Sequence, residues 1–304
     1  QLRGVFVEVG GLETFTEFCP AKINPYLAVT GRRGDGFHEL VSVVAPISVG
    51  DTLEVTAAEA GFSLSCDDPD LPTDGSNLVM KAAEMFRRKS GWKGGAEFRL
   101  QKRVPSGAGL GGGSSDAMGA LRALNRLSGE LLDPAALQEV AAEIGSDCPL
   151  FLHDGPVVMR GRGELIELND GIAATLRGCQ LLVVKPSFGV NTAWAYGEMA
   201  RQAPSSYRLA TDAEADLSRW NTRAASPNDM GFNSFTTVVG GKYPAIPAMA
   251  QRLKSEFGIK LHMSGSGSAC FMWVNDDTDV SALTETIRSG WGTSFWIAEA
   301  GCLG

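Results

Sequence analysis

The chain has 304 residues, a formal net charge of −8 from 35 acidic and 27 basic side chains, and 44% hydrophobic residues. This length favours two ordinary domains over one large one, and the negative charge disfavours nucleic acid and anionic membrane as partners. No apolar run approaches a membrane span, and the six scattered cysteines without a C-x-x-C pair favour free thiols in a reducing cytoplasm over a zinc site or disulfides. The chain begins with Gln1 in place of Met, which indicates that the natural start is trimmed or absent.

Apolar residues predict one or two strands over 13–30, broken near Pro20 and Pro25. Lys22 lies inside this segment, where a lone lysine is ordinarily a solvated edge charge. The loop 31–40 follows, with two arginines, an aspartate, a phenylalanine and a histidine between glycines. A surface turn is the default interpretation, but this density of basic and aromatic groups also suits recognition of a ring and a phosphate.

Strands are predicted around 41–49, 52–56 and 62–65, and a helix follows with an apolar face from Leu78 to Phe86. Ser76 or Asn77 is its expected cap, and Gly91 its expected end. Alternation over 96–101 then predicts another strand.

The stretch 102–116 reads K-R-V-P-S-G-A-G-L-G-G-G-S-S-D, in which five of the seven residues from Gly107 to Gly113 are glycine. Such a backbone can adopt positive φ and lie against a ligand. Ser114, Ser115 and Asp116 are expected as N-cap side chains of a helix that follows. A glycine loop that leads into a helix N-terminus presents free N–H groups to an anion, so it predicts phosphate binding.

Two common phosphate loops do not fit this stretch. The pattern G-x-x-x-x-G-K-[ST] is absent, and Gly240-Gly241-Lys242 only resembles its end. Residues 107–112 match G-x-G-x-x-G, but a dinucleotide fold requires a second strand that ends in an acid after the helix. Here Asp133 and Pro134 open another helix instead.

That helix is expected to end at Gly145, before a Gly-Ser-Asp turn in which Asp147 is by default a turn residue. A strand over 150–153 and a hairpin of 157–160 with 164–168 are predicted next.

Beyond a break near residue 170, strands are expected at 181–185, 259–263, 269–274 and 293–298, with helices at 192–201, 246–257 and 280–287. Apart from an irregular stretch at 203–244, this order predicts an antiparallel sheet covered by helices on one face. A second glycine loop lies at 262–269. His153 and His262 belong to no motif and are expected to be structural.

Three separated segments resemble the motifs of the GHMP kinases: P-A-K-I-N at 20–24 with G-D-G-F-H at 34–38, the glycine loop before Ser114, and M-S-G-S-G-S at 263–268. The resemblance runs from Pro20 to Phe271 and is weak from Arg201 to Lys242. The chain departs from the pattern at Cys19, Pro25 and Phe37. None of these departures removes a charged group, although Pro25 affects the local strand geometry.

The resemblance implies an α+β fold of two domains: an N-terminal, ATP-binding domain over 1–170, similar to ribosomal protein S5, and a ferredoxin-like α/β sandwich over 171–304. The substrate site is expected in the cleft between them. The implied activity is ATP-dependent phosphorylation, with Mg²⁺, of the 2-hydroxyl of a cytidine diphosphate ester of methylerythritol, in isoprenoid precursor biosynthesis. A cytoplasmic monomer or homodimer with only a small-molecule substrate as partner is expected.

The resemblance assigns family roles to individual residues of this chain. Lys22 and Asp147 correspond to the catalytic lysine and aspartate. The ATP site corresponds to Asn77, Leu78, Lys102, Pro105, Gly107, Ala108, Gly109, Leu110, Gly111, Gly112, Gly113, Ser114 and Ser115. The substrate site corresponds to Asn24, Phe37, His38, Asp147, Thr192, Tyr196, Gly265, Ser266 and Gly267, with Phe37 and Tyr196 around the cytosine and His38 at its edge. Ser114 or Ser115 is the candidate for contact with Mg²⁺, and a core position is the alternative role for Tyr196.

Two alternatives stay open. Another GHMP kinase, of the mevalonate or homoserine type, has no use for the aromatic and histidine of residues 34–38. A non-catalytic nucleotide-binding protein has no need of both Lys22 and Asp147.

Overall fold

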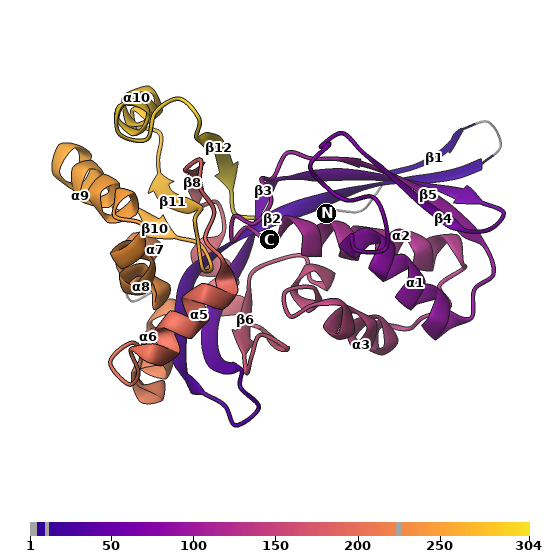
Figure 1. Cartoon of the computed structure of the whole chain (residues 1–304), viewed down its shortest axis with the longest axis horizontal. Helices are drawn as coiled ribbons and strands as arrows, with labels where there is room; N and C mark the ends of the chain where they lie inside the picture. The colour runs from indigo at the N-terminus through magenta and orange to yellow at the C-terminus, as the bar shows by residue number, and fades with distance from the viewer. Residues whose placement is uncertain (1–4, 10–11, 223–225) are drawn as a thin grey trace. The chain divides into compact units, whose positions relative to one another are not determined.

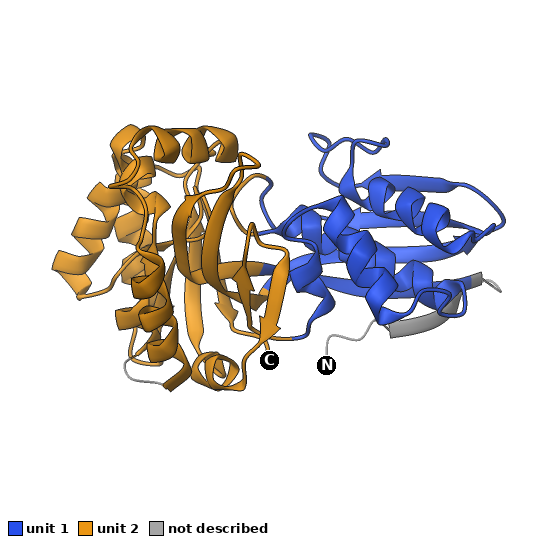
Figure 2. Ribbon diagram, turned by 90° about the horizontal axis from the view of Figure 1, so that it is seen from below, with its two compact units in different colours: residues 1–21, 49–106, 111–154 blue, residues 22–48, 107–110, 155–304 orange. Residues whose placement is uncertain are grey.

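The computed structural model describes residues 5–9, 12–222 and 226–304; Gln1 lies outside them. The chain forms two compact units that interleave along the sequence, coloured separately in Figure 2. Unit 1 comprises residues 1–21, 49–106 and 111–154, and unit 2 comprises residues 22–48, 107–110 and 155–304. The boundary expected near residue 170 stays a prediction.

Unit 1 is a sheet covered on one face by three helices (Figure 1). Its elements are β1 (Val5–Val9), the start of β2 (Leu12–Arg32), the end of β3 (His38–Ala58), β4 (Phe62–Cys66), α1 (Leu78–Ser90), β5 (Gly95–Gln101), α2 (Gly112–Leu127), α3 (Pro134–Ile144) and the 3₁₀ turn η1 (Pro149–Leu152). β5 pairs antiparallel with β3 and parallel with β4.

The helices α1 and α3 of unit 1 are capped as expected. The Asn77 side chain accepts the Val79 N–H, and Gly91 ends α1 in the left-handed conformation. Asp133 caps α3 by accepting the Ala136 N–H.

Three local predictions are wrong. β2 is one continuous strand through both prolines, and its described pairs with β1 lie at residues 12–16, before either proline. The strand expected at 150–153 is η1, because Pro149 opens a short helical turn. α2 begins at Gly112 after Gly111, so residues 114–116 lie inside the helix instead of capping it.

Unit 2 contains the rest of β2 and β3 and two sets of strands. Its other elements are β6 (Val157–Arg160), β7 (Leu165–Leu168), α4 (Asp170–Leu176), β8 (Gln180–Lys185), α5 (Thr192–Arg201), α6 (Ala210–Thr222), α7 (Pro227–Met230), β9 (Phe232–Asn233), α8 (Phe235–Lys242), α9 (Ala245–Phe257), β10 (His262–Met263), β11 (Cys270–Val274), α10 (Val280–Trp291) and β12 (Trp296–Gly301).

The four strands in the order β10-β11-β8-β12 are antiparallel throughout, as expected. The stretch 203–244 was wrongly expected to be irregular. It forms α6, α7, β9 and α8, and β9 pairs in parallel with β2 at Tyr26 and Leu27. Among the described residues, no helix has both the length and the apolarity for crossing a membrane.

A buried ion cluster sits in unit 1 where β5 ends. The Lys102 ammonium lies 2.5 Å from Asp51 Oδ2 and 2.8 Å from Asp116 Oδ2, with all three side chains almost wholly buried. Burial and the nearby Asp51 charge raise the pKa of Asp116 to about 7, although Lys102 opposes the shift. Burial disfavours the charge on Lys102, but the two carboxylates outweigh it and raise the pKa of the ammonium.

The raised pKa of Asp116 predicts a stability that falls as pH rises. The folded state holds this proton up to about pH 7, whereas the unfolded carboxyl loses it near pH ~3.9. The free energy of unfolding should therefore decline between about pH 4 and pH 7. Asp116→Asn, which stays neutral, should remove this part of the slope in urea unfolding at pH 5, 6, 7 and 8. An unchanged slope would contradict the assignment.

Gly119 predicts a steric effect on stability. It lies within α2, where alanine ordinarily stabilises by about 1 kcal/mol relative to glycine. Here a Cβ would lie 2.6 Å from the Cys19 sulfur, so Gly119→Ala should lower the free energy of unfolding by about 1–3 kcal/mol.

Gly197→Ala is the matched control, because Gly197 lies in α5 with open space around its Cβ position. It should stabilise the protein slightly. Adding Cys19→Ala to Gly119→Ala should recover most of the loss in urea titrations, and no recovery would exclude the contact as its cause.

Candidate active site

The glycine loop leads directly into α2. Gly107, Gly109 and Gly111 all have positive φ, between 63° and 81°. Gly111 is the N-cap of α2 and supplies no side chain to the helix N–H groups. Those groups are therefore left for an external acceptor, which suits the phosphates of ATP.

In unit 2, the first half of this loop is tied to the second glycine loop. Ala269 N–H donates to the Ala108 carbonyl at 2.9 Å, and Ser264 Oγ donates to the Gly109 carbonyl at 3.0 Å. A Cβ on Gly109 would overlap the Ser264 carbonyl oxygen, so only glycine permits this approach. Two glycine segments far apart in sequence thus form one backbone surface.

Lys22 lies beside both segments, within the same unit. Its backbone N–H donates to the Leu110 carbonyl at 2.8 Å, and a Cβ on Gly265 would lie 3.4 Å from its ammonium nitrogen. The ammonium donates to Asn24 Oδ1 at 2.6 Å, and Asn24 Nδ2 donates to Ser42 Oγ at 3.0 Å. Lys22 is 4% exposed, so protein contacts such as these orient its ammonium group, and water has little access to it.

Unit 1 holds the residues around the start of α2. Asp51 Oδ1 accepts the N–H groups of Arg103 and Val104 at 2.6 and 2.8 Å, which fixes the backbone that enters the loop. Leu78 lies next to Gly113, where an added Cβ would be 3.7 Å from its side chain. The Asn77 side-chain amide accepts a hydrogen bond from the Val79 N–H and donates one to the Pro72 carbonyl.

Asp147 is half-buried in the turn between α3 and η1, also in unit 1. Burial raises the pKa of the neighbouring Cys148 thiol to about 12, and a hydrogen bond with Ser114 partly opposes that shift. This contact brings the Asp147 turn next to the first turn of α2. Ser115 is fully buried, and its hydroxyl has no hydrogen-bond partner among the described residues.

An aromatic cluster in unit 2 contains His38. Its ring centroid lies 4.8 Å from that of Tyr196 and 5.9 Å from that of Tyr207. Burial, with the charge of Arg32, lowers the pKa of His38, so the ring is neutral near pH 7. Its Nε2 is buried and without a hydrogen-bond partner in the described part of the chain. Phe37 instead is 50% exposed, with the Arg162 guanidinium 5.0 Å from its ring centroid.

The expected site residues therefore fall into local groups. The structure brings together Lys22, Asn24 and Gly265; it also joins Thr192 to Ser266, whose hydroxyls are 2.8 Å apart. Gly267 and Ser264 close the second glycine loop through a backbone bond of 2.9 Å. Pro105 is half-buried after Val104, and Gly107 and Gly113 are exposed.

Sequence reasoning missed four contributors: Asp51, Ser42, Tyr207 and Asn233. Asn233 donates to the carbonyls of Met263 and Gly265 at 2.7 and 2.9 Å. Ser42 and Asp51 lie in β3, which contains no recognisable motif. The one feature of the sequence that could have indicated them is a polar side chain within an apolar run. Tyr207 and Asn233 lie in the stretch where the resemblance is weak.

Comparison with known proteins identifies the family. Residues 77–155 match the model for the GHMP kinases N terminal domain, and residues 213–292 match the GHMP kinases C terminal model. The chain is 36% identical over 284 residues to the 4-diphosphocytidyl-2-C-methyl-D-erythritol kinase of Methylacidiphilum infernorum (isolate V4), covering 92% of this chain and 94% of that protein.

Solved structures agree. A crystal structure of 4-(cytidine 5'-diphospho)-2C-methyl-D-erythritol kinase superposes with a TM-score of 0.75 at 31% identity, covering 94% of this chain and 99% of that one. Homoserine kinase from Cytophaga hutchinsonii reaches 0.74 at 18% identity, with 95% of both chains covered, which shows the shared fold alone. The glycine loops, the buried lysine and this similarity over nearly the whole length place the chain among the GHMP kinases.

Proposed function

We propose that this kinase transfers the γ-phosphate of ATP to the 2-hydroxyl of 4-diphosphocytidyl-2-C-methyl-D-erythritol, giving the 2-phosphate and ADP on the route to isopentenyl diphosphate. The observation that carries the chemistry is the Lys22 ammonium, held by Asn24 beside both glycine segments. Phosphoryl transfer is catalysed mainly by alignment and charge neutralisation, and this arrangement supplies both.

The glycine loop would hold the ATP phosphates on the N–H groups left open by Gly111. Mg²⁺ bound to those phosphates would neutralise part of their charge. Because Ser115 is fully buried, Ser114 is the hydroxyl that the ion can reach. Among the described residues, no group of three His, Cys, Asp or Glu side chains is arranged to hold a metal ion.

Lys22 would stabilise the charge that develops on the substrate oxygen and the transferred group, and Asp147 would accept or orient the hydroxyl proton. This mechanism requires both side chains to act on one hydroxyl. The family resemblance places Lys102 in the ATP site, but its ammonium is already paired with Asp51 and Asp116. We therefore assign it to fixing the loop entry, with no direct contact to ATP.

The cytosine end would be read by His38, whose buried, unpartnered Nε2 offers a hydrogen bond to a base edge. Tyr196 supports that ring, while Phe37 has the exposure needed to cover a base. Stacking contributes about 1–3 kcal/mol per base, which is enough to favour a cytidyl ester over mevalonate or homoserine. Thr192 and Ser266 would contact the diphosphate or polyol.

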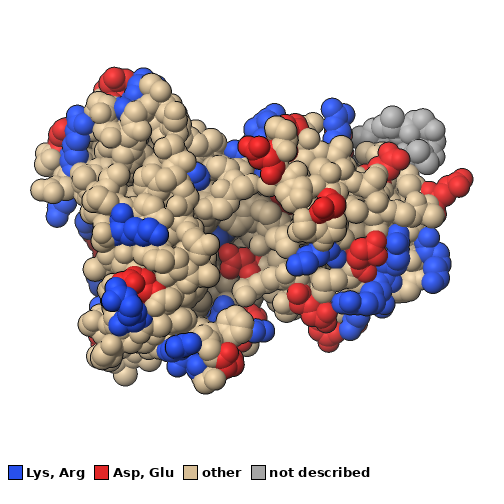
Figure 3. All heavy atoms as spheres, in the orientation of Figure 1, with Lys and Arg blue, Asp and Glu red and all other residues tan. Residues whose placement is uncertain are grey.

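All six cysteines are free thiols, which supports a reducing compartment, so we place the enzyme in the cytoplasm. In the view of Figure 3, basic and acidic side chains of unit 1 are intermixed without a continuous basic stripe. That surface supports a small-molecule substrate over nucleic acid.

The direct test is ATP consumption with the cytidyl ester, mevalonate and homoserine in turn. Turnover with the ester alone is expected. Lys22→Met and Asp147→Asn should each lower kcat by about 10³-fold or more, comparable to losing a group that stabilises the transition state, with ATP affinity changed less than about threefold. Full turnover by either variant, or no product from any substrate, would refute the proposal.

The Asp51 contacts predict a positioning effect on ATP. Asp51→Asn removes the charge that pairs with Lys102 and that strengthens the bonds from Arg103 and Val104. Loss of one charge-assisted bond of about 1.5–3 kcal/mol corresponds to about a tenfold or larger rise in KM for ATP. The KM for the cytidyl ester should change little.

Asp67→Asn is the matched control. Asp67 Oδ1 accepts the Lys102 backbone N–H at 2.7 Å, but its side chain is 46% exposed, so the effect should stay below about threefold. Equal effects of the two variants would show that burial of Asp51 is not what orders the loop.

A further inference from the structure

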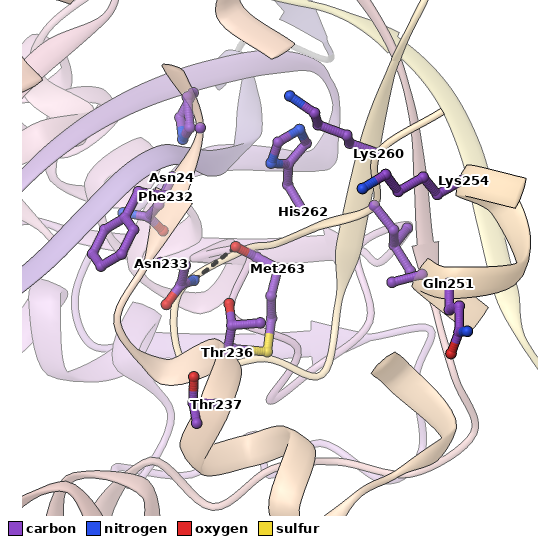
Figure 4. A pocket seen from close by; sticks show the side chains of 14 residues that line it. Asn24, Phe232, Asn233, Thr236, Thr237, Gln251, Lys254, Lys260, His262 and Met263 are labelled. Carbon is purple, nitrogen blue, oxygen red and sulfur yellow. Dashed lines mark hydrogen bonds between the residues drawn. The ribbon is translucent and has the colours of Figure 1, made fainter. Parts of the chain in front are cut away.

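Unit 2 contains a cavity of about 620 Å³ to which the proposed chemistry assigns no ligand (Figure 4). Its walls come from β9, α8, α9 and β10, together with Asn24 and Pro25 of β2. A volume of this size is typical of a pocket for a small organic molecule.

One side of the cavity is cationic. Lys254 and Lys260 lie on the same side in Figure 4, and no acidic residue is among those that line the cavity. Lys260 pairs with Asp229 at 2.7 Å, whereas Lys254 forms no ion pair within the described residues. In a chain with a net charge of −8, the ammonium of Lys254, with that of Lys260 beside it, indicates an anionic ligand.

Polar and apolar groups complete the lining. Thr236, Thr237 and Gln251 supply hydroxyl and amide groups, and Phe232, Leu261 and Met263 supply apolar surface. This combination suits a phosphate-bearing head joined to a short hydrocarbon.

His262 acts as a wall. Its ring stacks on Phe271 with centroids 5.3 Å apart, and its Nε2 lies 3.2 Å from Asn228 Oδ1. A Cβ on Gly231 would lie 2.5 Å from the ring, so glycine at 231 lets the imidazole close the cavity. Burial and the neighbouring Lys260 lower the pKa of His262 to about 4, so it is neutral near pH 7.

Two walls of the cavity are bonded to the catalytic apparatus of the same unit. Asn24 Oδ1 accepts a hydrogen bond of 2.6 Å from the Lys22 ammonium. Asn233 Nδ2 donates hydrogen bonds to the carbonyls of Met263 and Gly265 at 2.7 and 2.9 Å, and Figure 4 draws the bond to Met263. A ligand that displaced either amide would shift the lysine or the second glycine loop.

We propose that this cavity is a regulatory site for a small organic phosphate, with the phosphate at Lys254 and Lys260 and a short hydrocarbon body against Phe232, Leu261 and Met263. Occupancy lowers kcat, because a ligand in contact with Asn24 weakens its hold on the Lys22 ammonium. The site lies beyond the proposed reaction: of the residues expected to bind the substrate or ATP, Asn24 alone is among those that line this cavity.

The test is calorimetric titration of the full chain with isopentyl diphosphate, inorganic diphosphate and isopentanol. The alkyl diphosphate should bind at least tenfold more tightly than either fragment, because it uses both halves of the cavity. Lys254→Gln should weaken its binding about tenfold or more, and Ala250→Phe, which fills the cavity, should abolish it. Lys93→Gln removes an exposed charge far along the sequence in unit 1 and should change nothing.

The kinetic arm uses the cytidyl ester as substrate. Isopentyl diphosphate should lower kcat without changing the KM for the ester, and Lys254→Gln should lose this inhibition while keeping its own basal rate. Undetectable binding at millimolar concentration, equal binding by Lys254→Gln and Lys93→Gln, or competition with the ester would each overturn the proposal. Binding without any kinase activity would instead refute the proposed function and leave the ligand site standing.

Discussion

The hydrogen bond from the Lys22 N–H to the Leu110 carbonyl is the constraint on which the proposed chemistry depends. It joins β2 to the glycine loop through the backbone, so the position of the lysine does not rest on a flexible side chain alone. The second glycine loop then closes on the first through Ala108 and Gly109. These contacts leave little room for side chains, which explains why glycine occupies the crossing points.

Buried charge performs a similar task in unit 1. Two carboxylates share one ammonium at the end of β5, an arrangement that costs desolvation and is compensated by the hydrogen bonds Asp51 accepts from the backbone. Its benefit is conformational: the backbone enters the loop in one defined direction. The pKa of Asp116 is raised first by its burial and then by the neighbouring Asp51 charge, against the opposing effect of Lys102.

The sequence predicted much of the fold because helix caps and apolar periodicity act locally, as at Asn77, Asp133 and Gly91. The motifs likewise pointed to the loop, to Lys22 and to the asparagine beside it. The errors at β2 and 203–244 share a cause. Whether Pro20 breaks a strand, and whether residues 232–233 pair with β2, depends on neighbours distant in sequence. The pairing of Lys102 was hidden for the same reason, since Asp51 lies on the neighbouring strand β3 but 51 residues away in the sequence.

The interleaving of the units bears on how the chain acquires its structure during synthesis. Residues 22–48 belong to the unit that is completed only by residues 155–304. At about 5–20 residues per second, the ribosome releases the remainder of that unit on the order of ten seconds or more after this segment has emerged. The apolar side chains of this segment must therefore wait, exposed or held by a chaperone, until the residues that cover them arrive.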